Sequence, residues 1–130
     1  MKNEELLNLA KKVREKAFAP YSKFKVGAAL LTKSGEVFTG CNVECTSYGL
    51  TICAERVALT KAVSEGFTEF AKIAVVADTK EPCSPCGACR QFLHDFGDFD
   101  VILSNLENDT KEITIAELLP FGFKDSDLQK

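Results

Sequence analysis

Two short motifs carry most of the residues suited to chemistry. Cys86 and Cys89 form a CxxC pair within "SPCGACRQ", and Cys53 precedes Glu55 by two positions in "CAER". Thiolates bind zinc, and a catalytic zinc site with three protein ligands leaves its fourth position to water. A carboxylate beside that water does general acid and base work. The pattern favours a catalytic zinc site with Glu55 as its proton carrier.

Two helix beginnings are expected to bring these residues together. The spacing predicts helices at residues 53–65 and 86–96, with a buried strand at residues 71–77 between them. Because a crossover unit returns the chain in the same direction, both helix N-termini are expected at one end of the sheet. Residues two apart on a helix flank point about 200° away from each other, so Cys53 and Glu55 can share a site only at the helix tip.

The other elements follow from hydrophobic spacing and turn residues. Leucines at helical spacing predict a first helix at residues 3–18, before Pro20. Two apolar runs within residues 24–43 predict a β-hairpin. We expect Thr51 to cap the helix at residues 53–65 and Gly66 to follow its end. The remaining expected elements are a strand at residues 99–105 and, within residues 112–123, a short strand or turn, a short helix and an aromatic tail.

These elements and the composition predict one α/β domain over residues 1–130. We expect a three-layer α/β/α sandwich around a mixed, roughly five-stranded sheet, and a hydrophobic fraction of 45% supports a real core. Sixteen basic against nineteen acidic residues give a charge of −3, with no basic stripe to follow nucleic acid. The apolar runs fall short of the roughly 20 residues of a membrane-spanning helix. No secretory signal is apparent, so we expect a cytoplasmic protein.

The six cysteines leave other metal sites open. In a reducing compartment they indicate metal binding or thiol chemistry rather than disulfides. Cys83, Cys86 and Cys89 also have the C-x2-C-x2-C spacing of an iron–sulfur site, with Cys53 or Cys41 as the fourth ligand. A CxxC pair alone is more often a structural zinc or redox pair, but neither requires Glu55. Cys45 and Cys83 are expected to be spectators, and the sequence assigns no other role to Cys41.

Four stretches resemble the small homotetrameric zinc-dependent cytidine deaminases. They are "YSKFKVGAAL", "GCNVECTSYG", "CAERVALTKAVSEG" and "SPCGACRQFL", similar in order and spacing. The resemblance implies one zinc ion per subunit on Cys53, Cys86 and Cys89, with Glu55 as the proton shuttle. The implied reaction is hydrolysis at C4 of cytidine or 2'-deoxycytidine, which gives uridine or 2'-deoxyuridine and ammonia in pyrimidine salvage.

The same resemblance implies substrate contacts. Asn42 and Glu44 would bind the ribose hydroxyls and Phe24 the face of the base, although strand alternation by itself would make the first two solvent-facing. Arg56 is expected to withdraw charge from the thiolates, because three thiolates and a hydroxide around Zn²⁺ carry a net charge of about −2. Arg90 is ranked lower, as a surface side chain.

The resemblance also implies a homotetramer with sites shared between subunits. Phe123 matches the C-terminal aromatic that closes over the base, with Phe121 as the alternative, and Tyr48 matches a subunit contact. His94 is expected to be remote from the site. Two other readings stay open. One is deamination of a related amine such as blasticidin S, and the other is a non-enzymatic zinc or iron–sulfur module.

Overall fold

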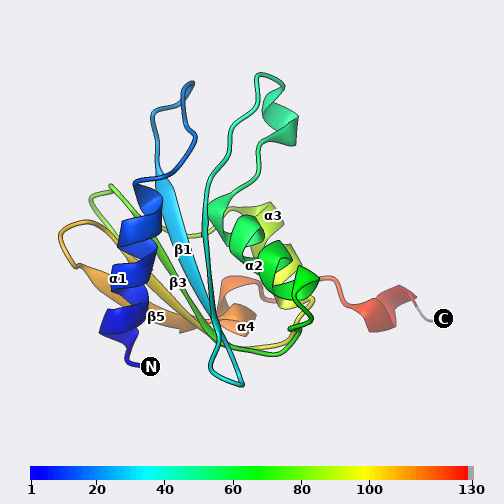
Figure 1. The fold of residues 1–130 in the computed structure, drawn as a ribbon. Helices are drawn as coiled ribbons and strands as arrows, with labels where there is room; N and C mark the ends of the chain where they lie inside the picture. The colour runs from blue at the N-terminus through cyan, green and yellow to red at the C-terminus, as the bar shows by residue number, and fades with distance from the viewer. Residues whose placement is uncertain (129–130) are drawn as a thin grey trace.

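A mixed five-stranded sheet forms the middle layer of the computed structural model, which describes residues 1–128 (Figure 1). The strand order is β2-β1-β3-β4-β5. Only β3 and β4 run parallel, because α3 crosses over between them. The strands are β1 (Val26–Thr32), β2 (Val37–Cys41), β3 (Phe70–Ala77), β4 (Asp100–Ser104) and β5 (Thr110–Thr114).

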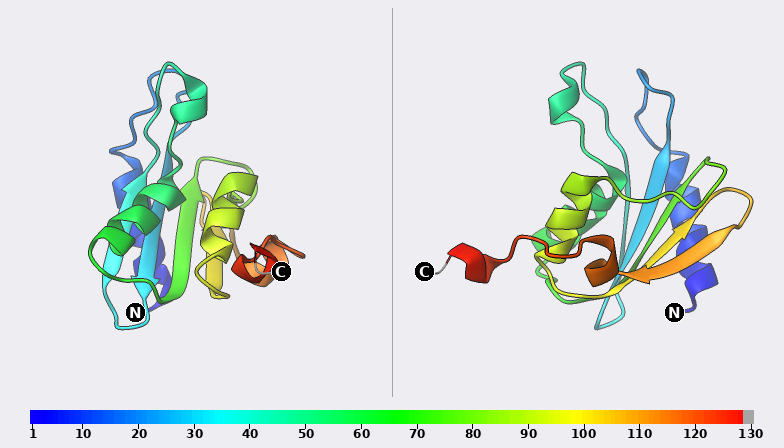
Figure 2. Two further views of the ribbon diagram at one scale, coloured as in Figure 1. Left: turned by 90° about the vertical axis from the view of Figure 1, so that its right-hand side faces the viewer. Right: turned by 180° about the vertical axis from the view of Figure 1, so that it is seen from behind.

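Helices cover both faces of this sheet, so the expected three-layer architecture is confirmed (Figures 1 and 2). One face packs against α1 (Asn3–Arg14), and the other against α2 (Ala54–Ser64), α3 (Gly87–His94) and α4 (Ile115–Leu118). Along β1, Ala28 and Leu30 belong to the α2–α3 core, whereas Ala29 and Leu31 belong to the α1 core. Two 3-10 turns, η1 (Tyr48–Leu50) and η2 (Asp125–Leu128), complete the described elements.

Two glycines allow helices to approach the sheet closely. A Cβ at Gly27 would lie 2.0 Å from the carbonyl oxygen of Ala10 in α1. A Cβ at Gly40 would lie 2.5 Å from the carbonyl oxygen of Ala54, the first residue of α2. Because the atoms at these contacts belong to the helix backbone, a larger residue in place of either glycine would displace the helix. The beginning of α2 is thereby fixed against β2.

The first helix ends earlier than its sequence suggests. It stops at Arg14 rather than continuing to residue 18. Phe18 instead pairs with the segment that follows β2: its N–H donates to Asn42 O at 2.9 Å, and its carbonyl accepts from Glu44 N at 2.9 Å. These long-range backbone hydrogen bonds outweigh the helical spacing of the local sequence.

The cap of α2 also differs from the expectation. Cys53 is the N-cap residue, and the Thr51 hydroxyl instead accepts from Cys45 N at 3.1 Å. The expected Thr51 cap is therefore wrong, because that hydroxyl bonds the preceding loop. Gly66 follows the helix with φ +95°, as expected of a residue just beyond a helix end.

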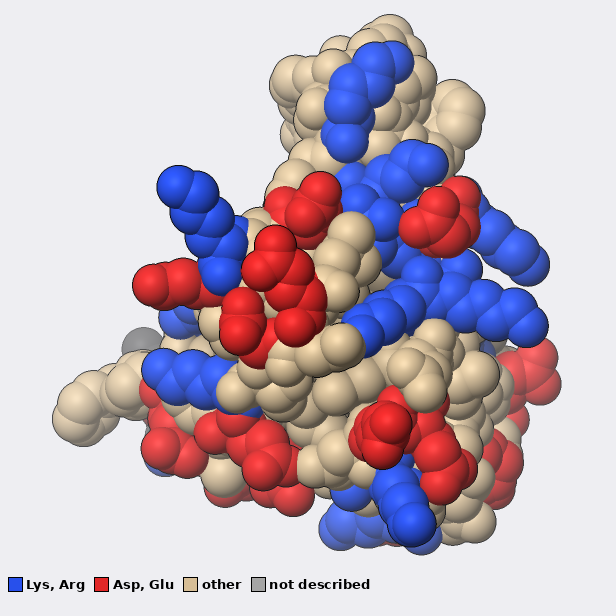
Figure 3. All heavy atoms as spheres, turned by 90° about the vertical axis from the view of Figure 1, so that its left-hand side faces the viewer, with Lys and Arg blue, Asp and Glu red and all other residues tan. Residues whose placement is uncertain are grey.

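The surface carries charges of both signs. On the side that bears α1, Lys and Arg side chains are accompanied by Asp and Glu (Figure 3). No helix within residues 1–128 is both long enough and apolar enough to span a lipid bilayer.

Candidate metal centre and active site

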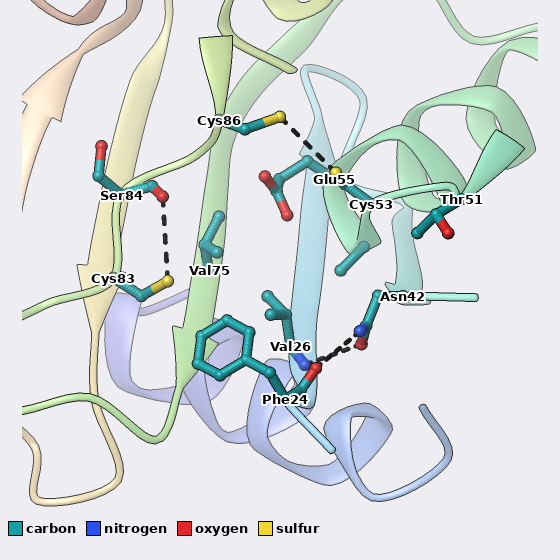
Figure 4. Close-up of a pocket in the computed structure, with 11 residues that line it drawn as sticks. Phe24, Val26, Asn42, Thr51, Cys53, Glu55, Val75, Cys83, Ser84 and Cys86 are labelled. Carbon is teal, nitrogen blue, oxygen red and sulfur yellow. Dashed lines mark hydrogen bonds between the residues drawn. The ribbon is translucent and has the colours of Figure 1, made fainter. Parts of the chain in front are cut away.

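Three sulfur atoms meet where α2 and α3 begin. Cys53 and Cys86 are the N-cap residues of these helices, and Cys89 lies in the first turn of α3. Cys53 Sγ lies 3.6 Å from Cys86 Sγ (Figure 4). Cys86 Sγ in turn lies 3.4 Å from Cys89 Sγ. All three sulfurs lie within 4.8 Å of one another. The expected convergence of the two helix N-termini is confirmed.

This cluster fits a zinc ion. Tetrahedral zinc with Zn–S bonds of about 2.3 Å separates its sulfur ligands by about 3.8 Å, close to the spacing seen. Hydrogen bonds from the Cys89 thiol and from Arg56 lower the pKa of Cys53 to about 5. The hydrogen bond to Cys53 and burial raise the pKa of Cys89. The thiols thus resist ionising together, and a divalent cation removes that resistance.

Arg56 reaches this cluster from the first turn of α2. Its Nη2 donates to Cys53 Sγ at 3.6 Å and to the carbonyl oxygen of Thr51 at 3.2 Å. A guanidinium that donates to a thiolate draws electron density from the sulfur. The structure therefore brings Arg56 to the atoms that the sequence reasoning assigned to it.

Glu55 is a buried acid beside the sulfurs. Its side chain is 3% exposed and lines a cavity of about 190 Å³, into which its carboxyl group points (Figure 4). Burial raises the pKa of Glu55, and the charge of Cys53 adds to that rise. A carboxyl group with a raised pKa holds and releases a proton more readily near neutral pH than an exposed glutamate does.

Asn42 lines the same cavity and fixes Phe24. Its Nδ2 donates to the Phe24 carbonyl at 2.8 Å, and its Oδ1 accepts from Val26 N at 2.9 Å. Asn42 is only 7% exposed, so the solvent-facing position suggested by strand alternation is wrong. The reason is that the backbone of the chain beyond β2 forms hydrogen bonds with residues 18 and 26, so that this segment does not lie at a solvent-exposed sheet edge. Phe24 also lines the cavity.

Glu44 is also buried, at 8% exposure, but it is not among the residues that line the cavity. Its Oε1 accepts from the backbone N–H groups of Tyr21 and Ser22 at 3.0 and 3.1 Å, and its Oε2 accepts from the Ser22 hydroxyl. The Ser22 hydroxyl and these N–H groups hold the pKa of Glu44 below its ordinary value. The carboxylate therefore fixes the loop that precedes Phe24.

The other cysteines stand apart from the three sulfurs. Cys83 lines the cavity, yet among the described residues the metal-ligating group comprises only Cys53, Cys86 and Cys89. The iron–sulfur arrangement that needs Cys83 is therefore not formed. The six cysteines form no disulfide within residues 1–128, and Cys41 and Cys45 are half-buried elsewhere.

Arg90 is the residue whose position the sequence reasoning missed. Its Nε donates to the Pro85 carbonyl at 2.9 Å, its Nη1 to the Leu118 carbonyl at 3.0 Å and its Nη2 to Ser84 Oγ at 2.6 Å. It is therefore a bridge between two segments rather than a free surface side chain. Its place next to Cys89 was the one available signal.

Three further candidates lie outside the cavity lining. Phe123 and Tyr48 are 54% and 62% exposed, and Phe121 is fully exposed. The Tyr48 ring meets the Tyr21 ring edge-on, with centroids 6.1 Å apart. His94 is also remote from the cavity, as expected, and packs near Gly122.

Comparison with known proteins identifies the family. A family model described as "Cytidine and deoxycytidylate deaminase zinc-binding region" matches residues 1–105, which include all three cysteine ligands and Glu55. The chain belongs to the zinc-dependent cytidine deaminases. Membership of this family excludes both an iron–sulfur site and a purely structural zinc site at these cysteines.

Individual relatives agree with the family. A cytidine deaminase from Sporosarcina psychrophila is 53% identical over 127 residues, 96% of this chain and 93% of that protein. One from Halalkalibacterium halodurans is 53% identical over 130 residues, 98% of both chains. A crystal structure of cytidine deaminase from Burkholderia pseudomallei superposes with a TM-score of 0.93 at 51% identity, covering 95% of this chain and all of the other.

A more distant relative bears on the alternative substrate. A protein named blasticidin-S deaminase from Bacillus cereus is 30% identical over 131 residues, 93% of this chain and 94% of that protein. The chain is thus markedly more similar to the cytidine deaminases above.

Proposed function

We propose that the chain hydrolyses cytidine and 2'-deoxycytidine to uridine and 2'-deoxyuridine, with release of ammonia. The observation that carries this proposal is the buried carboxyl group of Glu55 in the same cavity as the sulfur cluster. Cys53, Cys86 and Cys89 would hold a zinc ion, which would supply Lewis-acid activation of a water molecule. Residues 1–130 act as a single catalytic domain.

Glu55 carries the proton through the reaction. It accepts a proton from the attacking water and delivers it to ring nitrogen N3. Protonation of N3 lowers the energetic cost of disrupting the aromatic ring when the water oxygen adds at C4. It then moves the second proton of that water, whose oxygen is now bonded to C4, to the C4 amino group. The C4–N bond breaks, ammonia leaves, and the C4 carbonyl of uridine forms. The burial of Glu55 supports this role, because a carboxyl group with a raised pKa is well matched to both transfers near neutral pH.

Asn42 and Glu44 bind the ribose with the hydrogen-bonding capacity that their backbone partners leave free. One N–H and one lone pair of the Asn42 amide remain after its bonds to Phe24 and Val26. The Oε2 of Glu44, which accepts from the Ser22 hydroxyl, has room for a second donor. Buried groups of this kind discriminate against a ligand that leaves them unpaired. Phe24 contacts the face of the base.

We further propose that four copies assemble in the cytoplasm and share their sites. The support is a group of exposed apolar side chains within residues 18–52, because exposed apolar surface is typical of a subunit contact. Phe123 of one copy closes over the cavity of another, with Phe121 as the alternative, and Tyr48 lies at a subunit contact. The side chains of this group are Phe18, Tyr21, Phe24, Val43, Tyr48, Leu50 and Ile52.

The test is a substrate panel followed by ultraviolet absorbance. Zinc-loaded protein is given cytidine, 2'-deoxycytidine, free cytosine and blasticidin S at equal concentrations. We expect turnover of both nucleosides and little turnover of cytosine, because without a sugar the remaining N–H of Asn42 and the remaining lone pairs of Glu44 gain no partner. Preferred turnover of blasticidin S, or equal turnover of cytosine and cytidine, would contradict the proposal. Glu44→Gln and Asn42→Ala should lower the ratio of cytidine turnover to cytosine turnover. Lys2→Ala, a substitution at an exposed residue, should leave this ratio unchanged.

A further inference from the structure

The helix that carries two of the cysteine ligands also holds the C-terminal segment. We call residues 119–128 the C-terminal arm; it runs outward from the end of α4 past α3 (Figures 1 and 2). Arg90 and Gln91 directly follow Cys89 in α3. Arg90 donates to the carbonyl oxygen of Leu118, where the arm begins. Gln91 binds further along, at Phe123.

The Gln91 side chain hydrogen-bonds both backbone polar groups of Phe123. Its Nε2 donates to the Phe123 carbonyl at 2.8 Å, and its Oε1 accepts from Phe123 N at 3.2 Å. A side-chain amide that satisfies both polar groups of one residue fixes that residue's backbone much as a neighbouring strand would. The Phe123 ring is left 54% exposed and free to contact another molecule.

The turn between these two contacts needs such support. Phe121 has φ +57°, a left-handed conformation that residues with a side chain rarely adopt. Directly after it, a Cβ at Gly122 would lie 2.7 Å from Leu119 Cδ2 and 2.9 Å from His94 Nε2. A strained, tightly packed turn of this kind persists only where surrounding contacts over-determine it. The contacts of Arg90 and Gln91 flank the turn on both sides.

We propose that Gln91 is a positioning residue, which fixes Phe123 on the metal-bearing helix so that its ring is presented in one place to the active site of a second copy. The inference rests on the proposed role of Phe123. An arm already ordered before substrate binds does not have to lose its conformational freedom during binding. Because Gln91 lies two residues beyond Cys89, the geometry of one subunit's metal centre is linked to the lid that the subunit offers to its neighbour.

The kinetic test is a double-mutant cycle with Gln91→Ala and Phe123→Ala in the zinc-loaded enzyme. Two lost hydrogen bonds are expected to raise KM for cytidine about tenfold, while kcat changes by less than about threefold. If Gln91 acts only through Phe123, the double variant behaves like Phe123→Ala alone. Gln91→Met, which keeps the side-chain length without the hydrogen bonds, should behave like Gln91→Ala and separates the contact from lost packing.

A second readout does not depend on activity. Amide hydrogen exchange at Phe123 should accelerate about tenfold in both Gln91 variants, because that N–H loses its acceptor. Zinc content should stay at one ion per chain. Exchange at Phe123 that matches the wild type would overturn the anchoring itself.

The outcomes separate the inference from the function on which it rests. If Phe123→Ala leaves KM unchanged, the proposed lid role of Phe123 fails, and the inference fails with it. If Phe123→Ala raises KM but the Gln91 variants do not, the lid stands and the positioning role is overturned. Additive effects in the double variant would also overturn it, because Gln91 would then act by another route.

Discussion

Cys53 Sγ and Cys86 Sγ lie 3.6 Å apart, although 33 positions separate the two residues in the chain. Each is the residue at which a helix begins, and β3 lies between those helices in sequence. Val26 of β1 pairs with Ala77 at the carboxyl end of β3, and Val26 also lines the cavity. The metal centre is therefore positioned by the sheet through two helix ends, and not by one local loop.

The ligand assignment predicts that substitutions of Cys83 and Cys89, which lie near the beginning of α3, have different effects on zinc content. Cys89→Ala should lose most of its zinc, because it removes one of three sulfurs that lie within 4.8 Å of one another. Cys83→Ala should retain about one zinc ion per chain, since its sulfur lies outside that group. Metal analysis of the purified variants measures both. Loss of zinc from Cys83→Ala would show that Cys83 is a ligand.

The contact of Arg56 with Cys53 predicts a catalytic effect. Arg56→Ala removes the hydrogen bond to the Cys53 sulfur and should reduce kcat/KM or zinc affinity by about 10- to 100-fold, the usual effect of losing a group that supports a metal ligand. Arg56→Lys keeps the positive charge and should recover part of that loss. Steady-state kinetics and zinc titration measure the two quantities. Wild-type values for Arg56→Ala in both would refute the role.

The hydrogen bonds of Glu44 predict a pH-dependent stability difference. Because the Ser22 hydroxyl and two N–H groups lower the pKa of Glu44 from its ordinary 4.5, the stabilisation is present above pH 4.5 and is lost as the pH falls through the lowered pKa. Denaturant unfolding should therefore show wild type more stable than Glu44→Gln near pH 7, with the difference shrinking in acid.

Ser22→Ala is the matched control for that series. It removes the largest cause of the lowered pKa while keeping the carboxylate, so its difference from wild type should also shrink in acid. Comparing each variant with wild type at the same pH removes the common effect of zinc loss. A Glu44→Gln difference that grows below pH 4 would contradict the assignment.

The sequence predicted the parts of the fold that follow from local pattern. The residue types and spacing of Cys53, Glu55, Cys86 and Cys89 predicted a metal centre at two helix ends, and hydrophobic runs predicted the helices and strands. The end of α1 at Arg14 was not predictable locally, because it depends on the pairing of the following residues with the segment beyond β2.

Side-chain to backbone contacts were the least predictable part of the site. Arg90 resembles a surface residue until α4 and the loop before Cys86 are placed around it. Gln91 gives no chemical signal of its own, because a glutamine two residues beyond Cys89 could equally lie on a solvent-exposed helix face. Such contacts join segments that are distant in the sequence, and only the three-dimensional structure brings them together.

Glu55 provides the most direct test of the central claim. Zinc-loaded wild type and Glu55→Gln are compared for turnover of cytidine, with metal content measured on the same samples. We predict that Glu55→Gln keeps about one zinc ion per chain and loses about 10²- to 10⁴-fold in kcat, because glutamine has the same shape but carries no proton between the water and the base. A Glu55→Gln enzyme with zinc bound and a kcat near that of wild type would contradict the account.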